Sequence, residues 1–455
     1  MPAKCCEEFG IFLPRPPFSA PLSPYPDFSI VMSALPRLAI DRLQPGVFIS
    51  LGDLGWIHHP FLLNAFRIAS DKQIQVLHGL GLTEVTWDPA RSTAEPLPAT
   101  ARGETGAGAG TGEEDMDFAA AALAGMLDEK QRRIERVRAQ RDVFARRERE
   151  YESEAASIAD ILRTFAARPA DAHGDASALV GRVVDGLMDA PSVAIHLVNQ
   201  KSRDSGLAFH SLNVMVLTLL LGKAVGLSAD EMRQAGLGAL LHDAGKSEIP
   251  PRILRTPQRT PPEEEFYRAH IGYGIKAVAG ARNLSVAAKN VIACHHERWD
   301  GTGFPNKLAG ERIPRLARVV AIANRYDNLC NPYDVKRALT PAEALAQLFK
   351  KEAAHFDPDL LQRFIKTMGV YPPGSFVALS NGATGLVIET DPARLLSPTV
   401  MLHDAEIPRS EALVVDLKEA ELAIEAVVSP ASLPLSVVEY LAPRGRVDYY
   451  VEGSA

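Results

Sequence analysis

The sequence predicts a mainly α-helical protein, with a small α/β domain before the helical part and a small β-rich part after it. Three observations support this fold class. Apolar residues recur at helical spacing between residues 171 and 371, short strand-like segments separated by turns follow from residue 372, and a long charged helical segment precedes both. A chain of 455 residues is long enough for two or three domains.

Residues 1–34 are rich in proline and lack periodicity, so we expect them to be disordered. Ordered character resumes just after Met32, and we hypothesise that Met32 is the true start of translation. Glutamates and prolines interrupt every apolar stretch of this leader, which argues against a secretory signal.

Residues 35–92 are predicted to form the small α/β domain. Ser70 is placed to cap a helix that runs to Leu77. The adjacent pair His58-His59 has no nearby carboxylate or cysteine set, which favours a structural role over metal binding. Three strands are expected, at Leu38–Ile40, Val47–Ile49 and Glu84–Trp87.

Residues 93–116, rich in Ala, Gly, Thr and Pro, predict a flexible linker, and residues 117–170 predict one long charged helix. An apolar residue occupies every seventh position of this helix, whereas the neighbouring heptad column is only partly apolar. Two alternatives stay open: a homodimerising helix that passes a signal from the N-terminal domain, or an amphipathic helix that lies on its own domain. The repeat comprises Val137, Phe144, Tyr151, Ile158 and Phe165.

Residues 171–371 are expected to be helical throughout, because no strand-like alternation appears there. Residues 372–455 are predicted to form a β-rich appendage with turns such as Ser380-Asn381-Gly382. The expected strands are Phe376–Leu379, Leu386–Glu389, Val400–Leu402, Ala412–Asp416 and Val447–Val451.

The composition excludes several classes of protein. The formal net charge of −7 argues against binding to a nucleic-acid polymer, which requires a basic surface, but it allows a small anionic ligand in a local basic pocket. The four cysteines form no C-x-x-C pair, so neither a structural zinc site nor a disulfide framework is predicted, and a reducing cytoplasm fits. The most apolar stretch, Leu212–Leu227, contains Lys223 and predicts no membrane span.

The predicted helical domain contains most of the histidines of the chain. A single histidine on an apolar helix is more often a core residue than a ligand, but here two doublets each follow an apolar run. Burying an unpaired carboxylate is costly unless a cation compensates for its charge. The set is rich in nitrogen, which suits Fe, Mn or Zn better than Ca or Mg. It comprises His210, His242, Asp243, His270, His295 and His296.

Neighbouring residues on a helix diverge by about 100°. His242 is therefore placed to bind one metal ion while the carboxylate of Asp243 bridges to a second. Two such ions lower the pKa of a water molecule between them and stabilise charge on a phosphate. Lys246 lies on the same helical face, where it could reach a phosphate oxygen, and the alternative is a surface lysine near a helix end.

Together these residues resemble the HD-GYP domain of bacterial signalling proteins. The segment Trp56–Phe61, followed by Phe66, also resembles a small domain often found in front of HD-GYP domains. The main resemblance covers about residues 175–371 and rests on His242–Lys246, Ile249-Pro250, Ile253-Leu254, His270–Gly272, His295–Pro305, Leu308, Gly310, Ile313-Pro314 and Ala317-Arg318.

The resemblance implies an all-helical fold with two divalent metal ions, Fe or Mn in preference to Zn, that hydrolyses cyclic di-GMP to pGpG or GMP. It implies that Asp243 and Lys246 are catalytic residues. It implies the metal ligands His210, His242, Asp243, His270, His295 and His296. The implied surface for partners, including diguanylate cyclase (GGDEF) domains, comprises Gly301, Gly303, Phe304 and Pro305.

Several positions depart from the family pattern. Asn324 stands where the family usually has a further metal-ligating aspartate, and Gly206 stands where trinuclear members carry a glutamate. Phe304 replaces the tyrosine of the family name. Asn331 and Asp334 stand at two positions of a run in which the family often has phosphate-contacting basic residues.

Two main interpretations follow from these departures. In the first, the protein is a cyclic di-GMP phosphodiesterase with reduced activity. In the second, it is a catalytically impaired relative that acts as a cyclic-dinucleotide-sensing or protein-interaction module. Hydrolysis of another nucleotide or phosphodiester is a third alternative.

Overall fold

The computed structural model describes residues 35–52, 54, 59–98, 113–165, 167–189, 194–198, 206–256, 258–391, 394–405, 407–442 and 447–451. The expectations for the leader 1–34, for Met32 and for His58 lie outside these residues. So does most of the predicted linker.

The N-terminal domain is a four-stranded antiparallel sheet with one helix, in the strand order β1-β4-β2-β3. The three predicted strands and the helix are present, and the short strand β3 was not predicted. Ser70 occupies the position before the helix, but its side chain makes no capping hydrogen bond. The elements are β1 (Arg37–Ala39), β2 (Phe48–Ser50), β3 (Ala65–Arg67), α1 (Asp71–Gly79) and β4 (Glu84–Trp87).

A 52-residue helix, α2 (Glu113–Thr164), precedes the helical domain, and α3 (Pro169–Asp189) follows it. The predicted single helix to residue 170 is therefore interrupted, and the second helix starts at a proline, whose missing N–H is tolerated in a first turn. Tyr151, Ile158 and Phe165 of the heptad repeat are buried in one core together with residues of α3 and the next helix. This part of the repeat therefore packs on its own chain, as the second alternative expected.

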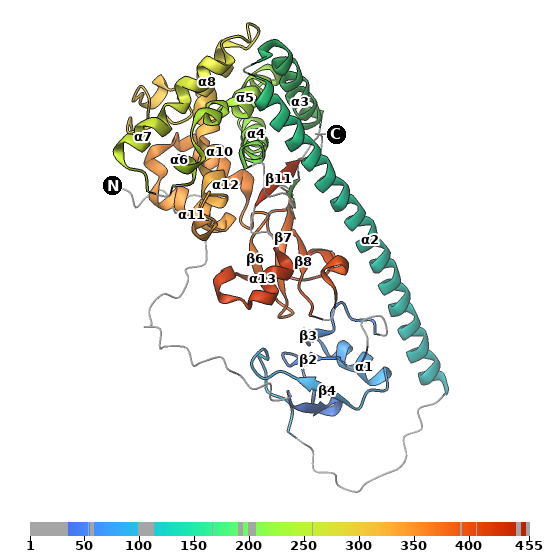
Figure 1. The fold of residues 1–455 in the computed structure, drawn as a ribbon. Coiled ribbons are helices and arrows are strands. Elements are labelled where there is room, and N and C mark those ends of the chain that lie inside the picture. Colours follow the sequence, from blue (N-terminus) through green and yellow to red (C-terminus); the bar gives the residue numbers. More distant parts are fainter. Residues whose placement is uncertain are drawn as a thin grey trace. The chain divides into compact units, whose positions relative to one another are not determined.

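The helical domain is organised around α4 (Gly206–Ala224), which packs against α2, α5, α10 and α12 (Figure 1). By length and composition α4 could cross a bilayer, but 78% of the apolar window is buried inside the chain. The other helices are α5 (Ala229–Leu241), α6 (Pro251–Arg255), α7 (Pro261–Arg268), α8 (His270–Val278), α9 (Val286–Cys294), α10 (Arg315–Cys330), α11 (Pro341–Lys351) and α12 (Pro358–Met368).

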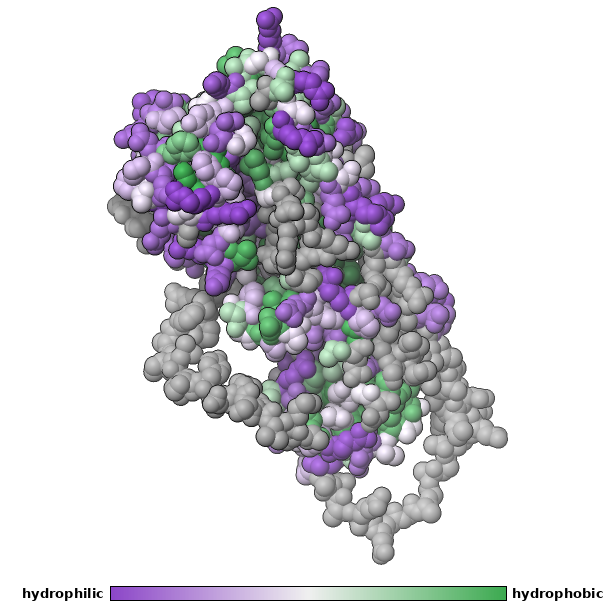
Figure 2. All heavy atoms as spheres, in the orientation of Figure 1, coloured by the Kyte–Doolittle hydropathy of each residue, from purple (hydrophilic) through white to green (hydrophobic). Residues whose placement is uncertain are grey.

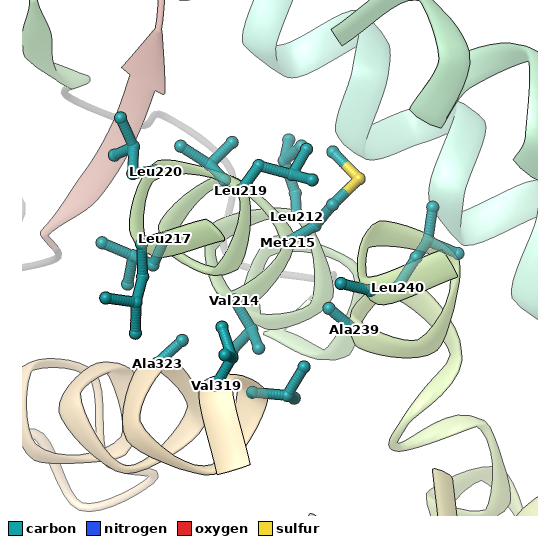
Figure 3. Close-up of a cluster of buried hydrophobic side chains, with 14 of the residues drawn as sticks. Leu212, Val214, Met215, Leu217, Leu219, Leu220, Ala239, Leu240, Val319 and Ala323 are labelled. Carbon is teal, nitrogen blue, oxygen red and sulfur yellow. The ribbon is translucent and has the colours of Figure 1, made fainter. Parts of the chain in front are cut away.

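The core of this domain explains why α4 is apolar on all sides. Leucine, valine and methionine side chains from α4 meet Ala239 and Leu240 of α5 on one side and Val319 and Ala323 of α10 on another (Figure 3). A helix that is enclosed by neighbours needs no polar stripe. On the face shown in Figure 2, by contrast, hydrophilic residues dominate the surface of the helical domain.

The β-rich part is a seven-stranded antiparallel sheet that follows the path β10-β6-β7-β5-β11, with β8 on β7 and β9 on β8. All five predicted strands are found; β10 and the short helix α13 (Leu435–Leu441) were not predicted. The strands are β6 (Phe376–Leu379), β7 (Thr384–Thr390), β8 (Thr399–Leu402), β9 (Val414–Asp416), β10 (Ile424–Val427) and β11 (Asp448–Val451).

One strand of this sheet, β5 (Ile195–Val198), lies inside the segment predicted to be helical throughout, and that prediction is wrong there. All four residues of β5 are buried, so they show no alternation of apolar and polar positions. A short buried run of this kind cannot be told from helix by periodicity. Pairing with β11 and β7, which lie far along the chain, makes it a strand.

Candidate metal centre and adjacent pocket

The predicted ligand residues come from helices that meet at one place. His210 lies on α4, while His242 ends α5 and is followed by Asp243. His270 begins α8. His295 ends α9 and is followed by His296. His296 is half-buried and the other five residues are buried, so the fold encloses polar side chains that are distant in sequence.

Four histidines direct Nε2 to the carboxylate of Asp243. From Oδ2, the distances are 3.3 Å to His210 and 3.2 Å to His242. From Oδ1, they are 3.5 Å to His270 and 3.6 Å to His295. Two groups that could hold a metal ion therefore share Asp243: one with His210 and His242, the other with His270, His295 and His296.

The second ring nitrogen of each of these histidines is held by an acceptor. Nδ1 of His242 lies 2.6 Å from the carbonyl oxygen of Ala239, and Nδ1 of His270 lies 2.6 Å from the carbonyl oxygen of Tyr267. Because a carbonyl oxygen only accepts, Nδ1 carries the hydrogen and Nε2 of the neutral ring keeps a lone pair that points inward. The corresponding acceptors are the Ile292 carbonyl at 3.0 Å for His295 and Asp327 Oδ2 at 2.5 Å for His210.

These lone pairs make the site suitable for cations. Nε2 of His270, His295 and His296 is buried without a hydrogen-bond partner among the described residues. Nε2 of His242 lies 3.2 Å from Nε2 of His210, and two such acceptors repel each other when both rings are neutral. Buried polar atoms without partners are costly, and metal ions between them would remove this cost. The nitrogen-rich donor set fits Fe, Mn or Zn.

The protonation states also favour metal binding. Burial lowers the pKa of His270 and of His295 to about 4, so both rings are neutral near pH 7. Burial alone would raise the pKa of Asp243, but His242 and Lys246 hold it well below its usual range. Burial lowers the pKa of His210 too, but its hydrogen bonds to Asp243 and Asp327 more than reverse this effect, so its pKa is raised. The site therefore offers an ionised carboxylate and neutral imidazoles at His270 and His295, while His210 would release a proton on binding a cation.

Lys246 lies inside the site and not on the surface, so the surface alternative is wrong. The side chain is 4% exposed, and Nζ lies 2.5 Å from Asp243 Oδ2. Burial lowers the pKa of Lys246, but the Asp243 carboxylate more than reverses this effect, so the ammonium group stays charged. Lys246 belongs to a 3-10 turn (Ala244–Glu248) directly after Asp243, and the first three residues of this turn are buried.

Asn324 is buried on α10 and lines the same pocket as His295, His296 and Lys246. Its side-chain oxygen accepts a hydrogen bond of 2.6 Å from the Asn328 amide. Asn324 is therefore placed beside the candidate ligands, but it offers a neutral oxygen that already has one partner.

The predicted partner loop is anchored beside the site. Phe304 stacks on His296, with ring centroids 4.6 Å apart and an angle of 18° between the planes. Glu297, next to His296, accepts hydrogen bonds from the backbone of the loop at Asn306 and Leu308. A Cβ atom at Gly303 would lie 2.3 Å from the Arg298 backbone nitrogen, so the loop needs glycine there.

A pocket of about 470 Å³ opens next to the candidate metal centre. Arg259 is ordered in its wall: Nε donates a hydrogen bond of 2.9 Å to the Ile253 carbonyl, and the guanidinium lies 3.8 Å from the centroid of the Tyr267 ring. Nη1 of Arg259 also lies 3.5 Å from Glu264 Oε2, so a phosphate bound there would share the ordered guanidinium with that carboxylate. The pocket is also lined by Arg255, Arg298, Arg325, Arg337, Tyr333 and Asp334.

Some residues were missed or given another role from the sequence. Asp327 lies outside the candidate ligand set, and its carboxylate is bonded to Nδ1 of His210. Asn331 was interpreted only as a lost phosphate contact, whereas its amide is bonded to Asp327 and to Val447. His59 is buried with Nε2 2.5 Å from Asn64 Oδ1, and it belongs to no metal-compatible group among the described residues.

Comparisons with known proteins identify the family of the chain. One family model, HD domain, matches residues 192–360, and another, Domain of unknown function (DUF3391), matches residues 35–176. The chain is 30% identical over 378 residues to the cyclic di-GMP phosphodiesterase PA4108 of Pseudomonas aeruginosa, a match that covers 80% of this chain and 84% of the relative. It is 32% identical over 171 residues to the 3′3′-cGAMP-specific phosphodiesterase 2 of Vibrio cholerae, which covers 37% of this chain and 32% of the relative.

Among solved structures, Bd1817, an HDG"Y"P protein from Bdellovibrio bacteriovorus, aligns with a TM-score of 0.41 and 16% identity, over 72% of this chain and 97% of that chain. The helical fold, the buried histidine–aspartate cluster and the family match define an HD-domain protein with a candidate metal site. More specifically, the chain belongs to the HD-GYP family of bacterial cyclic di-GMP phosphodiesterases and carries a DUF3391 domain in front of its HD domain.

Proposed function

We propose that this protein is a cytoplasmic enzyme that hydrolyses cyclic di-GMP to pGpG or GMP with two divalent metal ions, Fe or Mn in preference to Zn. The observation that carries the proposal is the convergence of four histidine Nε2 atoms on Asp243 beside an arginine-lined pocket. A cyclic dinucleotide has two phosphates, so it matches a site with cations at one end and arginines at the other.

Each side chain has a defined part in this proposal. Asp243 and the five histidines would hold the two ions, which would supply Lewis acidity and a water of lowered pKa. The charged Nζ of Lys246 lies at the edge of the pocket, where it can neutralise charge on the phosphate that reacts. Arg259, fixed by Ile253 and Tyr267, is placed to bind the other phosphate.

The departures from the family pattern support reduced activity. Asn324 brings no negative charge to the ligand set. Asp334 adds a carboxylate to the pocket wall, although Arg337 lies 3.5 Å from it and partly offsets its charge. The presence of asparagine at position 324, where the family usually has aspartate, also favours a second candidate function. In that function the pocket binds a cyclic dinucleotide without rapid turnover, and the protein acts as a sensing or interaction module.

Metal content and turnover separate the two functions. The full chain would be purified, its Fe, Mn and Zn measured, and hydrolysis of cyclic di-GMP assayed with added Mn²⁺ or Fe²⁺, with 3′3′-cGAMP as the matched second substrate. We expect about two metal ions per chain and turnover that is lost in Asp243→Ala. Less than one ion per chain together with no hydrolysis supports the module, and faster hydrolysis of 3′3′-cGAMP supports a different substrate.

Two partner proposals remain for the surfaces of the protein. A GGDEF domain is proposed to dock on the loop with Phe304 and Pro305, of which Pro305 is exposed. A homodimer through α2 would have to use the part of the helix before Tyr151, because the heptad repeat from that residue on is buried in its own chain. Gel filtration of the full chain tests the dimer, and an elution volume of a monomer contradicts it.

A further inference from the structure

The final strand of the sheet, β11, reaches the candidate metal centre through two asparagine side chains. Asn213 lies on α4, three residues after His210, and Asn331 ends α10, four residues after Asp327. Each amide is bonded on one side to Asp327 and on the other to the backbone at the start of β11.

Asn331 uses its whole amide for this connection. Nδ2 donates to Asp327 Oδ1 at 2.7 Å and to the Val447 carbonyl at 2.7 Å. Oδ1 accepts from the Val447 backbone N–H at 2.9 Å. Only a primary amide can donate on one side and accept on the other in this way, so neither aspartate nor leucine could replace it.

Asn213 makes the same kind of connection from α4. Nδ2 donates to Asp327 Oδ1 and, at 3.2 Å, to the Val447 carbonyl. Oδ1 accepts from the Tyr449 backbone N–H at 2.8 Å. The side chain is fully buried, so water cannot replace these bonds.

Asp327 passes this restraint to the candidate ligand. Oδ1 is held by the two amides, which leaves Oδ2 to accept from Nδ1 of His210 at 2.5 Å. A carboxylate in this position fixes the orientation of the imidazole and the ring nitrogen that faces the metal. The backbone of β11 is in turn fixed by its pairing with β5, where Tyr449 lies opposite Leu197.

We propose that strand β11, acting through Asn213 and Asn331, is a positioning element that orients His210 for metal binding. The inference rests on the proposed function, because it assumes that the His210–His242–Asp243 group binds one of the two ions. On this proposal the β-rich sheet takes part directly in the metal site. Asn331 is then a positioning residue, whereas the sequence had suggested only that a basic residue that contacts phosphate is missing there.

The test compares Asn331→Asp and Asn331→Ala with Tyr450→Phe in the full chain. Asn331→Asp keeps the size of the side chain but places a second carboxylate against Asp327. Tyr450→Phe is the matched control, because Tyr450 also belongs to β11 but its hydroxyl donates to Glu150 of α2, not to Asp327. Mn²⁺ is titrated into the metal-free proteins by calorimetry, and circular dichroism checks that each variant is folded.

We expect both Asn331 variants to bind one of two Mn²⁺ ions about 10- to 100-fold more weakly, the usual effect of losing an outer partner of a ligand, while the other ion is unaffected. Tyr450→Phe should match the wild type. Unchanged affinities in both Asn331 variants, or an equal loss in Tyr450→Phe, would overturn the inference.

A second readout needs no metal. The N–H proton of His210 that bonds to Asp327 should resonate far downfield in proton NMR spectra, and it can be assigned by its absence in His210→Gln. We expect this signal to move in Asn331→Asp and to stay in Tyr450→Phe; an unmoved signal in Asn331→Asp contradicts the inference. If the His210 signal moves in Asn331→Asp as expected but the wild type binds no Mn²⁺, the proposed function fails while the positioning of His210 by β11 stands.

Discussion

Nε2 of His242 lies 3.2 Å from Nε2 of His210, and both atoms lie within 3.3 Å of the same carboxylate oxygen of Asp243. Two neutral imidazoles would repel each other here, because their lone pairs face each other, whereas the raised pKa of His210 lets a proton on its ring relieve this repulsion. A metal ion between the two rings would take the place of that proton.

Metal binding should stabilise the fold. Mn²⁺ at about 100 times its dissociation constant should add about 2.7 kcal/mol to the free energy of unfolding, because an ion that binds only the folded state shifts the equilibrium towards it. Thermal unfolding after chelation and after re-addition of Mn²⁺ measures this effect. Ca²⁺ is the matched control, since it prefers oxygen ligands and should give little stabilisation. Equal stabilisation by Ca²⁺ would contradict the nitrogen-rich site.

Asn324→Asp should raise metal occupancy and turnover. A carboxylate at this position adds the negative charge that the neutral amide lacks, and the Asn328 amide can still donate to it. The matched control is Asn328→Asp, which introduces the same charge one turn along α10 but removes that donor. Metal analysis of the purified proteins checks the prediction, and an Asn324→Asp variant with the metal content of the wild type would speak against the assignment of this position.

Lys246→Met should lower kcat by about 100-fold, the usual effect of removing one group that stabilises transition-state charge. Metal content should fall little, because Lys246 is not itself a ligand. Lys276→Met removes an exposed lysine of α8 and serves as control. Steady-state kinetics with cyclic di-GMP measures kcat for the wild type and both variants. A variant with normal kcat would mean that Lys246 serves only to balance the charge of Asp243.

Arg259→Gln should raise KM by about 10- to 100-fold with a smaller change in kcat. Under the proposed function its guanidinium binds the phosphate that does not react, and a hydrogen bond to a charged group contributes about 1.5–3 kcal/mol. Arg282→Gln changes an exposed arginine outside the pocket and should have no effect. If KM is unchanged in Arg259→Gln, the substrate must lie elsewhere in the pocket.

Glu154 on α2 should make stability depend on pH. Burial raises its pKa from 4.5 to about 7 in the folded protein. Between these values the unfolded state has lost a proton that the folded state keeps, so stability falls as pH rises from about 4.5 to about 7 and then stays level. The whole effect is on the order of 1–3 kcal/mol.

The difference in melting temperature between Glu154→Gln and the wild type should therefore grow in favour of the variant between pH 5 and pH 8. Glu152→Gln, two residues earlier on α2, is the matched control. A constant difference across this range would show that Glu154 does not titrate as expected.

The sequence predicted those parts of the structure that depend on local patterns. The histidine doublets at the ends of apolar runs indicated a buried ligand set, and the structure brings those side chains together around Asp243. Five of the seven strands of the β-rich sheet were predicted from short strand-like segments between turns.

The features that were missed depend on contacts between distant segments. β5 is a strand because β11 and β7, both distant in sequence, pair with it. Asn331 has no local signal for its role, because its partners Asp327 and Val447 are brought to it by the helix end and by the final strand. Similarly, the stacking of Arg259 on Tyr267 depends on the turn between α6 and α7.

The most direct test of the central claim is an anomalous-difference map from crystals of the full chain grown with Mn²⁺. We expect two peaks on opposite sides of the Asp243 carboxylate, one near His210 and His242 and the other near His270, His295 and His296. A map without a peak at Asp243, or with its peaks elsewhere on the protein, would contradict the proposed two-ion site.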